Sequence, residues 1–102
     1  MAHYRLTPDA QSDLIEVRRF TVKQWSIAQS KKHLFELRQT IQLLASNSSL
    51  GKKRLEIGEP VLSFSYGSHV IYYVTDELQL VVFGVLHKRM VPTNQLDGRE
   101  VV

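Results

Sequence analysis

The sequence predicts an α+β fold in which a hairpin of two helices packs against an antiparallel sheet. Apolar residues recur at steps of three and four between residues 10 and 45, which is the spacing of amphipathic helices. The period then changes, and residues 61–87 are rich in the β-branched and aromatic side chains that favour strands. With a short extended segment at the start, the element order is β-α-α-β-β-β, which predicts helices gathered on one face of a sheet.

The first helix is expected to follow the extended residues 3–6. Thr7 can act as its N-cap, Pro8 has no N–H to leave unpaired at the first position, and Asp9 suits the positive end of the helix dipole. Trp25 is interpreted as a core residue and not as a platform for stacking bases. The stripe expected to face the core consists of Ala10, Leu14, Val17, Thr21, Trp25 and Ala28.

A second helix is expected to begin after Ser26, its N-cap, and to end at the break formed by residues 47–49. Two helices joined by so short a turn predict an antiparallel hairpin. The apolar positions of the second helix are Leu34, Leu37, Ile41, Leu44 and Ala45.

Three strands are expected in an antiparallel meander, over residues 61–66, 69–75 and 79–87. The run from Leu80 to Leu86 is almost continuously apolar, which is typical of a strand covered on both faces. Beyond Pro92 the chain has little periodicity and is expected to fray. We therefore predict one domain over residues 1–96 and a flexible tail over residues 97–102.

Composition narrows the classes of function. The 102 residues include 13 Lys and Arg against 10 Asp and Glu, a net charge of +3 that favours acidic partners without selecting one class. The chain has no cysteine, which excludes disulfides, thiolate zinc sites and a cysteine nucleophile. Neither a signal peptide nor a bilayer-spanning segment can be recognised, so a cytoplasmic protein is expected.

Several motifs, in order, resemble ParE toxins of the RelE/ParE superfamily. In the second half, Gly67-Ser68-His69 opens a strand, and Leu86-His87-Lys88-Arg89-Met90 ends the next one. The first half adds Leu6-Thr7-Pro8-Asp9-Ala10, Trp25 at the hairpin, Asn47 before Leu50-Gly51, and Glu56-Ile57. The resemblance runs from about residue 4 to about residue 96 and implies a RelE/ParE-like fold.

The resemblance also implies a function. ParE toxins block DNA gyrase without catalysis or a cofactor, and a ParD-like antitoxin neutralises them by wrapping an extended C-terminal segment around the toxin. One segment departs from the family, whose members often follow the Glu-Ile pair with Arg-x-Gly-Tyr-Arg. Here Gly58 and Leu62 stand where arginines are expected, and the basic charge lies earlier, in residues 52–54. The resemblance therefore does not determine which residues contact the target.

The end of the last strand is the expected target-binding surface. Lys88, Arg89 and Met90 leave the strand there, with His87 in support, and Arg and Met are enriched at protein interfaces. The alternative is a solvated strand end.

Two other functions remain open: a ribosome-dependent mRNA endonuclease like RelE, and a non-toxic binding module of the same fold. RNA cleavage needs proton-transfer groups and cations, which the relatives assemble from arginines, lysines and a late tyrosine or histidine. Leu62 occupies an expected arginine position and no tyrosine follows Tyr73, so no catalytic residue is assigned.

An antitoxin segment is expected to cover apolar residues that lie beside the core stripes of the two helices. By steps of 100°, Ile15 and Val22 fall to one side of the first stripe, and Phe35 and Leu43 fall off the second. Exposed apolar patches usually mark partner sites. The alternative is that these side chains are buried within the hairpin.

Two polar groups are interpreted as structural. His69 and His87 lie on adjacent strands, but two histidines without thiolates or carboxylates rarely bind a metal, so hydrogen-bonded histidines are expected. The basic segment Lys52-Lys53-Arg54 is expected to be a solvated loop, because proteins that bind DNA specifically usually neutralise more than three phosphates. Neither a metal site nor specific nucleic-acid binding is predicted.

Overall fold

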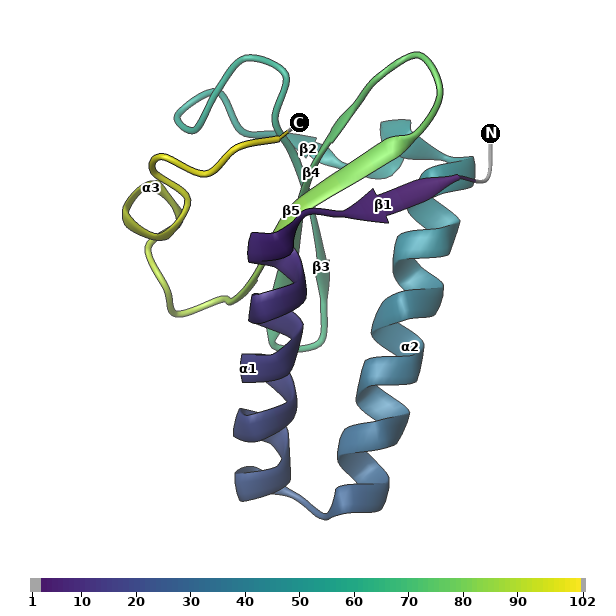
Figure 1. Cartoon of the computed structure of the whole chain (residues 1–102), viewed down its shortest axis with the longest axis vertical. Coiled ribbons are helices and arrows are strands. Elements are labelled where there is room, and N and C mark those ends of the chain that lie inside the picture. Colours follow the sequence, from purple (N-terminus) through teal and green to yellow (C-terminus); the bar gives the residue numbers. More distant parts are fainter. Residues whose placement is uncertain (1–2, 102) are drawn as a thin grey trace.

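The computed structural model describes residues 3–101 and confirms the predicted α+β fold. Two long helices stand side by side and cover one face of a sheet (Figure 1). The elements in order are β1 (Tyr4–Leu6), α1 (Pro8–Gln24), α2 (Ile27–Ser46), the 3-10 turn η1 (Ser48–Leu50), β2 (Lys52–Lys53), β3 (Leu62–Tyr66), β4 (His69–Thr75), β5 (Leu80–His87) and α3 (Pro92–Gln95).

Both predicted helix caps are present. The hydroxyl of Thr7 accepts a hydrogen bond from the backbone N–H of Ala10 at 3.2 Å, and that of Ser26 accepts from Gln29 at 3.1 Å. Across the hairpin, the buried hydroxyls of Thr21 and Ser30 share a hydrogen bond of 2.6 Å. The Ser26 cap and this cross-link stabilise the hairpin near the turn between α1 and α2.

The prediction that Trp25 is a core residue is wrong. The four earlier members of the stripe in α1 are buried, but the side chain of Trp25 is 41% exposed. The reason is local, because α1 ends at Gln24 and Trp25 adopts an extended backbone as its C-cap. The helical step of 100° therefore no longer applies at residue 25 or at Ala28, which is exposed on α2.

The sheet is mixed, with the strand order β1-β5-β4-β3-β2. The meander of β3, β4 and β5 is antiparallel as predicted, whereas β1 pairs with β5 in parallel. Lys52 and Lys53, predicted to lie in a loop, form the short edge strand β2 against β3. Their side chains are exposed, which suits an edge strand because charge there discourages further pairing.

Strand β5 is buried on both faces, as its apolar run predicts. Leu80 and Val82 face the helices, while Val81 and Phe83 face a second cluster on the far side of the sheet. A bulge follows, since Tyr73 pairs with Val82 and Tyr72 with Gly84, which leaves Phe83 as the extra residue.

The chain after Pro92 covers the far side of the sheet, so the expected fraying is wrong for the helix α3 and for Leu96. Leu96 is only 5% exposed, and a Cβ at Gly84 would lie 2.6 Å from its Cδ2 atom. The apolar far face needs this cover, and the glycine makes room for it. The predicted flexibility of residues 97–102 stays a prediction, and Val102 lies outside the described residues.

Candidate partner-binding surfaces

A groove of about 910 Å³, here called the helix groove, lies between α1 and α2. Its floor is apolar and includes Ile15, which is 53% exposed, and Ile27, which is 63% exposed. Of the described residues that line it, none is acidic. The cations on its walls are Arg18, Arg19, Lys23, Lys31 and Arg38. Such a surface suits a segment that is both acidic and apolar.

The structure brings two of the four expected antitoxin-binding residues to this groove. Ile15 and Val22 line it, whereas Phe35 and Leu43 do not. Phe35 and Leu43 are 62% and 48% exposed, so burial within the hairpin does not describe them.

The residues of α2 that line the groove are not the ones predicted from the sequence. Leu34 packs against the core as predicted and also lines the groove, whereas no role was predicted for Ile27. A usable signal existed, since Ile27, Lys31, Leu34 and Arg38 follow one another at helical spacing.

The turn after β5, here called the strand-end turn, comprises His87, Lys88, Arg89 and Met90. Backbone hydrogen bonds fix it, with the N–H of Lys88 donating to the Ser68 carbonyl and that of Met90 to the His87 carbonyl, both at 2.9 Å. The ring Nδ1 of His87 also accepts the N–H of Arg89 at 3.1 Å. Lys88, Arg89 and Met90 are exposed, so the turn presents two cations and a thioether to solvent.

A cluster of three histidines lies behind this turn. Nε2 of His33 on α2 and Nδ1 of His69 on β4 share a hydrogen bond of 3.1 Å, and the His69 and His87 ring centroids are 5.5 Å apart. His69 is thus the hydrogen-bonded structural histidine that the sequence predicts. His33 was not anticipated, although it stands four residues before Leu37 on the buried stripe of α2.

His33 and His69 favour the neutral imidazole. Burial, aided by the charges of His33 and His87, lowers the pKa of His69 to about 4. Burial also lowers the pKa of His33, and the nearby carboxylate of Glu36 opposes that shift. Across residues 3–101, no group of three or more His, Cys, Asp or Glu side chains is arranged to hold a metal ion.

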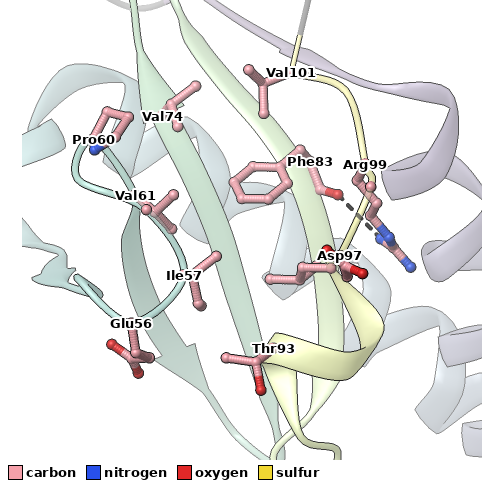
Figure 2. A pocket seen from close by; sticks show the side chains of 13 residues that line it. Glu56, Ile57, Pro60, Val61, Val74, Phe83, Thr93, Asp97, Arg99 and Val101 are labelled. Atoms are coloured by element: carbon pink, nitrogen blue, oxygen red, sulfur yellow. Dashed lines mark hydrogen bonds between the residues drawn. The ribbon is translucent and has the colours of Figure 1, made fainter.

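A cleft of about 480 Å³ lies on the far side of the sheet, between residues 56–61 and the C-terminal segment (Figure 2). Phe83, Val61 and Val74 line it with apolar side chains. Arg99 reaches across to the Phe83 carbonyl at 3.1 Å and forms a two-pronged ion pair with Asp13 of α1.

The segment that departs from the family pattern therefore forms a wall of this cleft. Gly58 lines it, whereas Leu62 begins β3 and packs against the helix-side core. Arg54 is no freely solvated charge either, because its guanidinium lies over the Tyr72 ring and donates to Glu56 at 2.8 Å.

The comparisons with known proteins agree with this architecture. Residues 4–92 match the family described as the ParE toxin of the type II toxin-antitoxin system parDE. The chain belongs to the ParE toxin family. That match covers the helical hairpin, the whole sheet and the strand-end turn.

Two relatives extend the match over most of the chain. Toxin ParE1 of Caulobacter vibrioides is 27% identical over 90 residues, which is 88% of this chain and 93% of the relative. Toxin ParE of Escherichia coli is 30% identical over 101 residues, 97% of each chain. The ParE resemblance inferred from the motifs is thereby confirmed, and the chain is a member of the ParE toxin family of type II toxin-antitoxin systems. Within residues 3–101 no helix is long and apolar enough to cross a membrane.

Proposed function

We propose that this ParE-family toxin inhibits DNA gyrase by protein contact, without catalysis, and that a ParD-like antitoxin holds it inactive by occupying the helix groove. Both partners and the toxin would meet in the cytoplasm. The observation that carries the antitoxin assignment is the joint presence in one groove of an apolar floor and five cations, one of which, Arg19, is paired with Glu16.

The groove offers a path for an extended segment. A second hollow, of about 510 Å³, shares Ile15, Arg18, Leu34 and Arg38 with the helix groove and reaches Leu6 of β1. A segment lying along both would cross the hairpin and arrive at an edge strand of the sheet, where extended peptides can pair. Apolar burial would supply affinity, and the cations would steer an acidic partner.

The strand-end turn supports target binding at a different place. Lys88 and Arg89 are exposed, and neither takes part in the ion pairs found among the described residues. Arginine at such a position can form several charge-assisted hydrogen bonds with a partner. If the antitoxin and the target bind to separate surfaces, the antitoxin can block the toxin by extending over the strand-end turn or by changing the conformation of that turn.

Two features support binding over RNA cleavage. Leu62, which packs against the core, stands where an arginine is expected, and its apolar side chain cannot bind a phosphate. The His87 ring packs edge-on against Phe20 with centroids 5.3 Å apart, and its Nδ1 accepts the Arg89 N–H. One ring nitrogen is thus engaged in shaping the turn.

The deciding experiment is DNA supercoiling by purified gyrase, with the parent toxin and an Arg89→Ala variant titrated in parallel. We expect dose-dependent inhibition by the parent, weakened by about tenfold in the variant. Adding a purified ParD-like antitoxin should restore supercoiling. Folded parent that leaves gyrase unaffected would reject this target, and ribosome-dependent mRNA cleavage would be assayed next.

A further inference from the structure

A small cavity of about 260 Å³ opens beside the strand-end turn, between α1 and the chain that follows β5. Phe20 and Met90 lie on its walls and are 41% and 45% exposed. Val17 and Val85, both buried, lie deeper. The cavity is large enough for one Leu, Met or Phe side chain.

The Phe20 ring is held in place before any partner arrives. It packs edge-on against His87, with centroids 5.3 Å apart, and against His69 at 6.4 Å. The His69 ring is itself fixed by its hydrogen bond with His33. An aromatic wall supported in this way loses little side-chain freedom on binding, which favours affinity.

The charges around the cavity are unequal. Its two acidic lining residues have cationic partners: Asp13 pairs with Arg99, and Glu16 pairs with Arg19 at 2.7 Å. Lys88 and Arg89 lie between the lining residues His87 and Met90 and belong to none of the ion pairs in residues 3–101. The uncompensated charge in the turn that borders the cavity is therefore positive.

We propose that this cavity, here called the anchor pocket, receives one apolar side chain carried on an acidic segment of the toxin's protein target. Phe20 and Met90 contact that side chain, and Lys88 and Arg89 contact the flanking acidic residues. Interfaces commonly gain most of their affinity from such an anchor in a pocket with polar groups at its rim. This inference rests on the proposed function in that the strand-end turn faces the target.

The anchor pocket is distinct from the helix groove. Of the residues that line the two hollows, none is common to both. On α1, Phe20 lies about 140° around the helix axis from Ile15, at roughly 100° per residue. Changes in the pocket should therefore leave antitoxin binding intact.

The test compares Phe20→Ala, Met90→Glu and Lys88→Glu with the parent, and uses Leu78→Ala as the control. Leu78 is 71% exposed in the turn before β5, at the opposite end of that strand. Each protein is measured for gyrase inhibition, for growth arrest on induction, and for affinity to the antitoxin. Antitoxin binding reports whether each variant is folded.

We expect each of the three variants to lose at least about tenfold in inhibition and to arrest growth poorly, while Leu78→Ala stays within about twofold of the parent. Antitoxin affinity should not change. If Phe20→Ala also fails to bind the antitoxin, Met90→Glu decides, because the exposed Met90 side chain has no part in the helical hairpin.

Other outcomes separate the two proposals. Phe20→Ala and Met90→Glu that inhibit as the parent does would overturn the anchor pocket and leave gyrase as the target. Lys88→Glu with undiminished potency would overturn the acidic character of the segment. A parent that arrests growth through Phe20 and Met90 without inhibiting gyrase would keep the pocket and reject gyrase. A folded parent that neither inhibits gyrase nor arrests growth would overturn both the gyrase proposal and the anchor pocket.

Discussion

The helix groove and the strand-end turn are both basic, but they are built in different ways. The groove comes from two helices that are neighbours in sequence, and its lining follows helical spacing between residues 15 and 38. The anchor pocket beside the turn combines α1, β4, β5 and the C-terminal segment. Single substitutions on the helices can change the helix groove. The anchor pocket depends on the packing that holds distant segments together.

Charge reversal in the helix groove should have the largest effect. Replacing Lys31 and Arg38 by glutamate places like charges against an acidic antitoxin and should weaken its binding by about a thousandfold, or about 4 kcal/mol. Titration calorimetry with the purified antitoxin measures this. A Lys52→Glu, Lys53→Glu variant carries the same charge change on β2 and should bind normally. Equal losses in both variants would indicate an effect of net charge alone.

Breaking the Asp13–Arg99 pair should destabilise the region behind the strand-end turn. The two side chains are only 13% and 15% exposed, and Asp13 also accepts the Val85 N–H at 2.9 Å. Arg99→Ala leaves that carboxylate without its cation and should cost about 3 kcal/mol of unfolding free energy. Urea denaturation checks this. Arg19→Ala, which removes an exposed pair, should cost under about 0.5 kcal/mol and provides the contrast.

Acidification should destabilise the toxin through the histidine cluster. Because the pKa of His69 is about 4 in the folded protein against an ordinary value of 6.5 for histidine, the unfolded chain binds more protons between these values. Stability is therefore full above pH 6.5 and falls as the pH drops toward 4, by about 2 kcal/mol between pH 7 and 5. Urea melts at both pH values measure this. A His69→Gln variant should show a smaller difference, and an unchanged difference would assign the effect to other groups.

The smallest expected effect is a loss of stability at the turn between α1 and α2. Ser26→Ala removes the side chain that accepts from Gln29 and should cost about 1 kcal/mol, because one helical N–H loses its partner. Thermal melting measures the loss. Antitoxin affinity should fall by less than tenfold, since the cations of the groove remain. A larger fall would mean that the groove depends on the exact position of the first turn of α2.

The sequence predicted the elements well and the lining of the helix groove only in part. Caps at Thr7 and Ser26 and the strand periods are local signals, so they could be found without the fold. Lys52 and Lys53 were misassigned because a two-residue edge strand is defined by its partner β3 and has no period of its own. The packing of Phe20 was not anticipated because the rings that contact it lie on β4 and β5.

The helical hairpin, the antiparallel meander, the burial of β5 and the ParE family could all be predicted, because each depends on neighbouring residues or on motif order. The parallel pairing of β1, the histidine cluster and the ion pair of Asp13 with Arg99 became visible only in the folded chain. His33 and His69 lie 36 positions apart, and Asp13 and Arg99 lie 86 apart. Contacts over such separations form only when the whole chain packs, so no local spacing encodes them.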